Sequence, residues 1–100
     1  MISLGAEILE YLKDYHTDED VAIKGKDLCI LFNIKDKHLR NLVSDLRQAG
    51  EAVCSSSNGY WYSEDPYDIE KTLRRLEGQV FNMNRAIRGL KDILAGGSNE

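Results

Sequence analysis

The sequence predicts an α+β, mostly helical protein in which three short helices and a β-hairpin precede one long C-terminal helix. Three observations support this prediction. Apolar residues recur at helical spacing in three separate segments of the first half of the chain. Asn58-Gly59 then separates two short β-prone runs, which is the strongest short-range signal for a hairpin with a type I′ turn. Finally, an unbroken heptad pattern runs from Ile69 to Leu94.

The composition is typical of a small folded protein. The chain has 100 residues, a net charge of −4 and no apolar stretch long enough to span a bilayer. Its two cysteines, Cys29 and Cys54, lie in apolar contexts, which indicates reduced core thiols rather than a disulfide framework. The N-terminus lacks the charged and then apolar pattern of a signal peptide. We therefore expect a cytoplasmic protein of a bacterium, phage or plasmid.

Two short helices are predicted over residues 3–15 and 25–33 because apolar residues recur there at spacings of three or four. Ser3 is the expected N-cap of the first helix. The apolar positions are Leu4, Ile8 and Leu12 in the first segment and Leu28, Leu31 and Phe32 in the second. An acidic loop and a short β-prone run, residues 21–23, connect the two helices.

A third helix is predicted to begin at Lys35 or Asp36 and to end at Gly50, which can adopt the left-handed conformation of a helix C-terminus. Its apolar stripe consists of Leu39, Leu42, Val43 and Leu46. At 3.6 residues per turn, the opposite face carries Lys37, Asn41, Ser44 and Gln48, with Arg40, His38 and Asp45 on its flanks. Asn and Gln can pair bidentately with adenine, and Arg or Lys with guanine, so this face can read base edges. Solvated helix faces carry the same residue types, so the simpler interpretation stays open.

In the predicted hairpin, the Asn58-Gly59 turn fixes which residues lie opposite one another. The expected pairs are Ser57 with Tyr60 and Ser55 with Tyr62. Tyr60 and Tyr62 then share one face with Val53, and Trp61 lies on the other face. The alternation does not decide which face is buried. We expect the Val53 face to point inward, which would leave Trp61 partly exposed and available to a partner.

The last helix is predicted to follow Asp65, an N-cap that precedes Pro66 at the first helical position. About 28 residues would extend roughly 42 Å, more than the preceding unit can cover. We therefore expect its apolar seam to pair with a second copy of the chain. The expected dimerisation residues are Leu73, Leu76, Val80, Met83, Ile87, Leu90 and Leu94. Few charges flank the seam, so parallel and antiparallel pairing both stay open. The alternative is a helix that folds back over its own domain.

Charge is unevenly distributed along the chain. Residues 1–21 have a net charge of −5, whereas residues 22–49 carry six basic and three acidic side chains, a net charge of +3. This distribution favours contact of the middle of the chain with nucleic acid, although such an excess is also common on neutral surfaces. The serine-rich hairpin tip offers hydroxyl, amide and backbone N–H groups to phosphates, but no Arg or Lys. The candidate DNA-binding residues are Lys24, Lys35, Lys37, His38, Arg40, Asn41, Ser44, Arg47, Gln48, Ser56, Ser57 and Asn58.

The third helix and the hairpin together resemble a winged helix-turn-helix domain, in which the third helix enters the major groove of DNA. The match covers about residues 3–63. Two segments, Leu46-Arg47-Gln48-Ala49-Gly50 and Ser55-Ser56-Ser57-Asn58-Gly59-Tyr60, are similar to small winged-helix proteins of Firmicutes phages and conjugative elements. The resemblance implies a homodimer that binds double-stranded DNA in replication, DNA transfer or transcription control. Replication or transfer proteins would be further partners.

No catalytic or metal site is predicted, because the histidines, cysteines and carboxylates show no ligand or catalytic spacing. We expect a protein that is not an enzyme and needs no cofactor. The predicted organisation is a winged helix-turn-helix domain over residues 1–64, a dimerisation helix over 65–95 and a disordered tail over 96–100. The alternative function is an adaptor that binds proteins and not DNA, which the acidic N-terminal third and an exposed Trp61 would favour.

Overall fold

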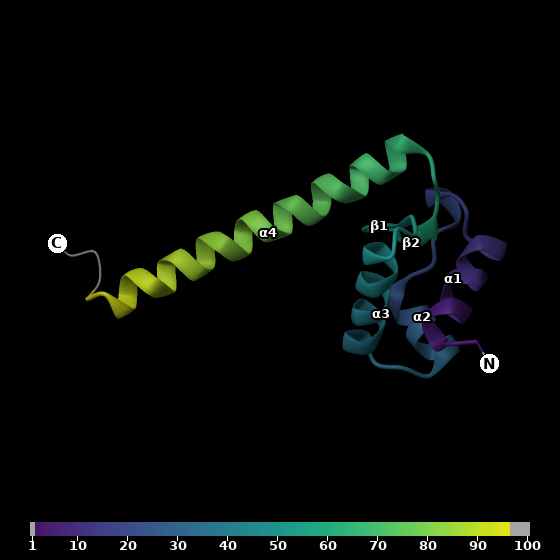
Figure 1. Ribbon diagram of the computed structural model, residues 1–100, viewed down its shortest axis with the longest axis horizontal. Helices are drawn as coiled ribbons and strands as arrows, with labels where there is room; N and C mark the ends of the chain where they lie inside the picture. Colours follow the sequence, from purple (N-terminus) through teal and green to yellow (C-terminus); the bar gives the residue numbers. More distant parts are fainter. Residues whose placement is uncertain (1, 97–100) are drawn as a thin grey trace.

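The order of the elements follows the prediction (Figure 1). The computed structural model describes residues 2–96. Its elements are α1 (Leu4–Tyr15), a short 3₁₀ turn η1 (Glu19–Val21), α2 (Gly25–Phe32), α3 (Asp36–Gln48), β1 (Val53–Ser56), β2 (Gly59–Tyr62) and α4 (Pro66–Leu94). The predicted α+β, mostly helical class is confirmed, and the arrangement is winged-helix-like. The tail that was predicted to be disordered lies, apart from Gly96, outside the described residues.

Helices α1, α2 and α3 pack around one hydrophobic core because each presents a single apolar stripe. Ile8, Leu12, Leu28 and Leu39 have no exposed surface. Ser3 caps α1 as predicted, since its hydroxyl accepts a hydrogen bond from the backbone N–H of Ala6 at 3.2 Å. The four buried side chains come from three different helices, so the core fixes the direction of α3 relative to the other two.

Two left-handed residues set the path of the chain around α3. Asn33 ends α2 with a φ of 54°, and Gly50 follows α3 with a φ of 92°, as predicted for a helix C-terminus. Helix α3 begins at Asp36, and Lys35 occupies the N-cap position without a side-chain hydrogen bond. Instead, the Asp36 carboxylate pairs with Arg40 one turn later at 2.7 Å.

The hairpin differs from the prediction in its register. The observed pairs are Val53–Tyr62, Cys54–Trp61, Ser55–Tyr60 and Ser56–Gly59. The two loop residues are therefore Ser57 and Asn58, and the expected pairing of Ser57 with Tyr60 is wrong. The predicted type I′ turn is also wrong. That turn requires a positive φ at both central residues, and of the predicted central residues, Asn58 and Gly59, only Gly59 has one, at 124°. The slip amounts to two positions, which leaves every side chain on its predicted face of the hairpin.

A third segment accounts for this register. Ile23 forms an antiparallel bridge with Tyr60, with N···O distances of 2.9 and 2.8 Å. A Cβ atom on Gly59 would lie 2.3 Å from the carbonyl oxygen of Ile23. Only glycine lets the two backbones approach so closely. The glycine is therefore required by a contact with a distant segment and not by the turn alone.

Trp61 is buried, so the expectation that it is partly exposed is wrong. Its exposed fraction is 0%, and that of Cys54, its cross-strand neighbour, is 1%. The first turns of α4 pack against β1, and the hydroxyl of the buried Thr72 accepts a hydrogen bond from the backbone of β1 at 3.1 Å. The opposite face, with Val53, packs on the main core as expected. Because α4 supplies a second layer, both faces of the hairpin are covered.

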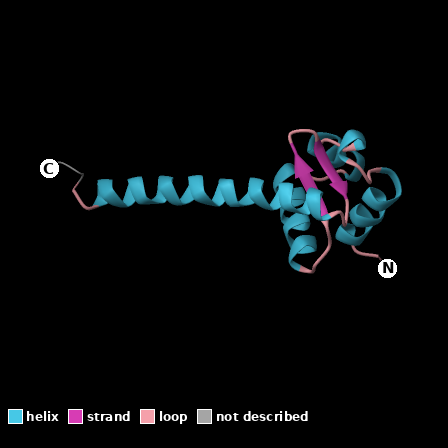
Figure 2. Ribbon diagram, turned by 90° about the horizontal axis from the view of Figure 1, so that it is seen from above, coloured by secondary structure: helices cyan, strands magenta, loops and turns pink. Residues whose placement is uncertain are grey.

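Beyond these turns, α4 projects away from the rest of the molecule (Figures 1 and 2). Asp65 caps it and Pro66 is its first residue, as predicted. We refer to residues 2–76 as the globular unit and to residues 77–94 as distal α4. Every residue of distal α4 is exposed. Its exposed large apolar residues are Val80, Phe81, Met83, Ile87, Leu90, Ile93 and Leu94. The helix does not fold back over its own domain. Within residues 2–96, the predicted dimerisation seam is therefore exposed, except at Leu76, which is partly buried.

Candidate nucleic-acid interface

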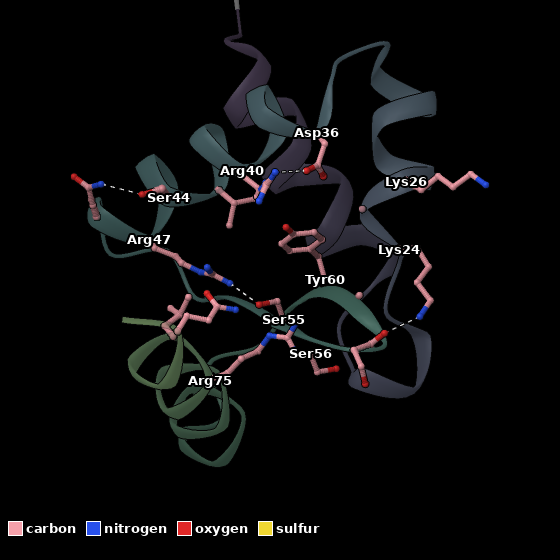
Figure 3. Close-up of a pocket in the computed structure, with 17 residues that line it drawn as sticks. Lys24, Lys26, Asp36, Arg40, Ser44, Arg47, Ser55, Ser56, Tyr60 and Arg75 are labelled. Atoms are coloured by element: carbon pink, nitrogen blue, oxygen red, sulfur yellow. Dashed lines mark hydrogen bonds and ion pairs between the residues drawn. The ribbon is translucent and has the colours of Figure 1, made fainter. Parts of the chain in front are cut away.

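An open groove of about 920 Å³ lies between α3, the hairpin, the start of α2 and the third and fourth turns of α4 (Figure 3). The elements meet here because the core holds α3 against β1 on one side, and α4 packs against β1 on the other. The polar residues that line the groove are Lys24, Lys26, Asp36, Arg40, Ser44, Arg47, Gln48, Ser55, Ser56, Ser57, Tyr60, Arg75 and Gln79.

The groove is strongly basic. Five of its side chains are basic and one is acidic, a net charge of +4 in a chain whose net charge is −4. The acidic side chain, Asp36, is already paired with Arg40. Within residues 2–96, no carboxylate lies within ion-pairing distance of Lys26, Arg47 or Arg75. Such unneutralised cations in a concave surface attract anions, and phosphate groups in particular.

Arg47 connects α3 to the hairpin. Its Nε donates a hydrogen bond to the carbonyl oxygen of Val53 at 2.8 Å, and its Nη2 donates to Ser55 Oγ at 3.0 Å. Burial lowers the pKa of the Arg47 guanidinium, and the nearby charge of Arg75 lowers it further. Two guanidinium groups from different helices therefore repel each other across the groove, and an anion between them would relieve this repulsion.

Tyr60 lies at the centre of the groove, between α3 and the start of α2 (Figure 3). Its ring is half-buried and packs closely over Gly25, where an added Cβ would lie 3.2 Å from the ring. Burial raises the pKa of the Tyr60 hydroxyl above its usual value. The hydroxyl is therefore a neutral hydrogen-bond donor at physiological pH, which suits a phosphate oxygen as its acceptor.

The outward face of α3 carries the other predicted residues. Lys35, Lys37, His38 and Asn41 are exposed and lie outside the groove. Gln48 donates a hydrogen bond to Ser44 Oγ at 3.0 Å. This pair lines the groove and also belongs to the outward face, so the two surfaces are continuous.

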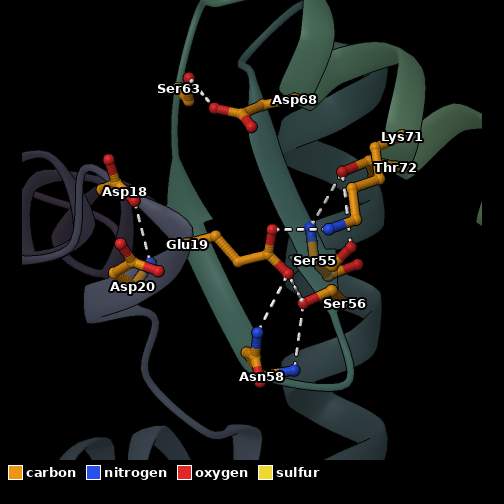
Figure 4. A network of polar contacts seen from close by, with 10 residues as sticks. All are labelled: Asp18, Glu19, Asp20, Ser55, Ser56, Asn58, Ser63, Asp68, Lys71 and Thr72. Atoms are coloured by element: carbon orange, nitrogen blue, oxygen red, sulfur yellow. Dashed lines mark hydrogen bonds and ion pairs between the residues drawn. The ribbon is translucent and has the colours of Figure 1, made fainter.

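The hairpin tip is fixed by contacts that the sequence did not predict (Figure 4). Glu19 accepts hydrogen bonds from Ser56 at 2.7 Å and from Asn58 at 3.1 Å, and it forms an ion pair with Lys71 of α4 at 2.7 Å. These contacts, that with Lys71 first, lower the pKa of the Glu19 carboxyl. Lys24 donates to the carbonyl oxygen of Ser57 at 2.7 Å. The tip is thus held to η1, α2 and α4, and the predicted hydroxyl and amide groups are partly occupied.

Of the predicted residues, the structure brings Lys24, Arg40, Ser44, Arg47, Gln48, Ser56 and Ser57 together in the groove. Sequence reasoning missed Lys26, Tyr60 and Arg75. The cluster Lys24-Gly25-Lys26 could have indicated Lys26, since both lysines flank the start of one helix. Arg75 gave no such signal, because its position depends on the direction in which α4 leaves the hairpin.

No protein-family model, curated protein or solved structure matches this chain. Among residues 2–96, no three side chains of His, Cys, Asp or Glu are grouped so as to hold a metal ion. None of the helices in that range has the length and apolar character needed to cross a membrane. The basic groove and the exposed distal α4 are the two surfaces of the described residues that bear on function.

Proposed function

We propose that this protein binds duplex DNA through α3 and the basic groove beside it, as a homodimer that pairs through α4. The observation that carries this proposal is the groove itself, where Lys26, Arg47 and Arg75 face an open surface without carboxylate partners among the described residues. The groove adjoins α3 along the residues Ser44 and Gln48. A helix with a polar outward face next to a line of free cations suits a duplex, whose phosphates flank its major groove.

In this proposal, the parts of the surface have different roles. The outward face of α3 enters the major groove, where Asn41 and Gln48 can pair with adenine edges and Lys37 with guanine. The cations of the groove bind the phosphates of one strand and fix the position of α3. The rigid hairpin tip, which carries no Arg or Lys, adds backbone N–H groups and hydroxyls. Base reading and phosphate binding thus come from adjoining parts of one surface.

The homodimer is supported by the apolar seam of distal α4. Val80, Met83 and Leu90 are 55%, 63% and 63% exposed, and they recur along one side of the helix. A contiguous exposed apolar surface of this kind is typical of a protein–protein interface. Since one basic groove provides few phosphate contacts, two linked copies would bind DNA much more tightly than one. The resemblance to mobile-element proteins is the basis for a role in replication, DNA transfer or transcription control.

Binding of a random-sequence duplex, measured by fluorescence anisotropy at increasing salt, tests the proposal. If four cations per copy contact phosphates, log K should fall with log salt with a slope of about −3 to −4 per copy. That slope corresponds to a loss of roughly 100-fold in affinity between 50 and 200 mM salt. Absence of binding at low salt would contradict the proposal and would favour the protein-interaction adaptor instead.

A matched pair of arginines sharpens this test. Arg75→Ala should reduce the salt slope by about 1, because Arg75 would contact one phosphate. Within residues 2–96, its side chain makes no ion pair that supports the fold. Arg74→Ala is the control, since Arg74 lies beside Tyr67, Glu70 and Lys71 and does not line the groove. Arg47→Ala is a weaker test because Arg47 also holds β1. Equal effects of Arg74→Ala and Arg75→Ala would contradict a role for the groove.

The adaptor alternative loses one of its supports in this structure. An exposed Trp61 would be available to a partner, but this side chain is fully buried. The exposed apolar surface of distal α4 remains, and it serves a homodimer as well as a different protein.

A further inference from the structure

The side chains beside the seam of distal α4 distinguish the two ways in which two copies can pair. The seam places Val80 and Ile87 at heptad position a, and Met83 and Leu90 at position d. The flanking e positions are Glu77, Asn84 and Lys91, and the flanking g positions are Gln79, Ala86 and Ile93. All of them are exposed, so they are free to face a second helix.

In a parallel pair, these flanking side chains would not meet opposite charges. In a parallel pair, each g residue lies beside the e residue five positions later in the other helix. Gln79 would meet Asn84, and Ala86 would meet Lys91. Neither contact joins opposite charges.

Antiparallel pairing brings opposite charges together. When one helix is reversed, e residues lie beside e residues of the other helix. If the pair is centred on Arg85, Glu77 of each copy lies beside Lys91 of the other, which gives two ion pairs. The apolar layers are then Leu76 with Leu94, Val80 with Leu90, and Met83 with Ile87, all within residues 76–94.

This span consists of distal α4 and of Leu76, which is partly buried and lines the groove. Ile69 and Leu73, nearer the start of α4, are also exposed, at 41% and 50%. Every residue from 77 to 94 is exposed, whereas Thr72 is buried against the hairpin. A parallel pair in register would also use Ile69 and Leu73, and it would bring both globular units to the same end. An antiparallel pair centred on Arg85 uses only Leu76 and distal α4. Because α4 extends from one side of the globular unit (Figure 2), such a pair would keep the two units at opposite ends.

We propose that distal α4 pairs antiparallel with a second copy of this chain, with reciprocal contacts between Glu77 and Lys91. This inference rests on the homodimer in the proposed function and determines its geometry. Thr72, where α4 contacts the hairpin, lies 13 residues from Arg85, so the two contact points are about 26 residues or roughly 39 Å apart along the helix pair. This distance is comparable with the spacing of half-sites one turn of DNA apart, about 34–36 Å.

Disulfide cross-linking without DNA tests the orientation. Val80→Cys and Leu90→Cys are prepared in full-length chains, one of which carries a tag that changes its size. Antiparallel pairing places Val80 beside Leu90, so mixed samples should form tagged–untagged dimers, whereas each variant alone should cross-link little. The two copies of Val80 would be about 15 Å apart along the axis, beyond disulfide reach. Wild-type protein is the control, and its native thiols should cross-link weakly because burial raises the pKa of Cys29 and of Cys54.

Two contrary results would test the orientation of the helices and the existence of the homodimer separately. Cross-linking of Val80→Cys with itself, or of both variants with themselves, would overturn antiparallel pairing and leave the homodimer standing. Absence of any cross-link, with a monomeric mass by light scattering, would overturn both.

Charge reversal provides a second test. Lys91→Glu should weaken the dimer by roughly 2- to 10-fold in Kd, since each dimer would then contain two like-charge contacts. Adding Glu77→Lys to the same chain should restore the dimer, because the two charges are exchanged. If Lys91→Glu weakened the dimer and the added Glu77→Lys did not restore it, the antiparallel contacts between these residues would be contradicted.

Discussion

The globular unit and distal α4 are built from similar proportions of apolar residues but bury them differently. In the globular unit, Ile8, Leu12, Leu28 and Leu39 are fully buried, and both faces of the hairpin are covered. In distal α4, residues of the same type are exposed along the whole segment. The globular unit buries its apolar side chains within the chain. Distal α4 can bury its apolar side chains only against another surface, and an isolated helix of this length with two glycines is only marginally stable in water.

The largest expected effect comes from Trp61→Ala, because Trp61 is the largest of the fully buried side chains. The free energy of unfolding, measured by urea denaturation with circular dichroism, should fall by about 3–5 kcal/mol. Phe81→Ala is the comparison in distal α4, where the ring is 62% exposed. In dilute protein it should change the same quantity by less than about 0.5 kcal/mol. Similar losses for both variants would mean that distal α4 is packed within its own chain.

The second prediction concerns the seam. Ile87→Asp places a carboxylate in the proposed dimer interface and should raise the dimer Kd by roughly 100-fold or more, measured by sedimentation equilibrium. The globular unit should keep its stability, because Ile87 contacts none of it. Asn82→Asp adds the same charge outside the seam and should leave the dimer nearly unchanged. An equal effect of the two substitutions would show that only net charge matters.

Two glycines should respond to alanine with opposite signs. Gly59→Ala forces a Cβ against Ile23 at a φ of 124°, which should cost about 1–3 kcal/mol of unfolding free energy. Gly78→Ala meets nothing within 4 Å and should stabilise α4 by up to about 1 kcal/mol. Thermal denaturation of both variants measures the difference. A neutral Gly59→Ala would contradict the close approach of residue 23 to β2.

The smallest effect should come from Glu19, which holds the hairpin tip to α4. Its contacts, that with Lys71 first, lower the pKa of its carboxyl in the folded state. Its stabilisation is therefore fully present above the unfolded-state pKa of about 4.3 and is lost as the pH falls through the lower folded-state value. Glu19→Gln should thus lower the urea midpoint at pH 7, and this difference should shrink as the pH is lowered below the unfolded-state pKa. Glu10→Gln, at an exposed carboxylate of α1, should not change the midpoint over this pH range.

Local sequence signals predicted the elements well. Helical periodicity located α1, α2 and α3, and the Asp65-Pro66 pair located the start of α4. Gly50 and Ser3 took the predicted roles at helix ends. These features depend on neighbours within a few positions, so they can be predicted from the sequence without the fold.

The hairpin and the groove depend on distant residues, and there the prediction was incomplete. Ile23 forms a bridge with Tyr60 of β2, and Trp61 is fully buried in a hairpin whose first strand packs against α4. Both hairpin faces carry aromatic residues, so alternation could not show that both would be covered. Arg75 reaches the groove only because α4 leaves the hairpin in a particular direction. Residues on α3 could be predicted because one helix carries them all.

The most direct test of the central claim is an NMR titration of ¹⁵N-labelled protein with a short duplex at low salt. If DNA binds in the groove, signals of Lys24 to Lys26, of α3 and of the Arg75 side chain should shift together, whereas those of the exposed face of α1 and of residues 80–94 should stay in place. Shifts confined to distal α4 or α1, or no shifts at all, would contradict the assignment of the basic groove to DNA.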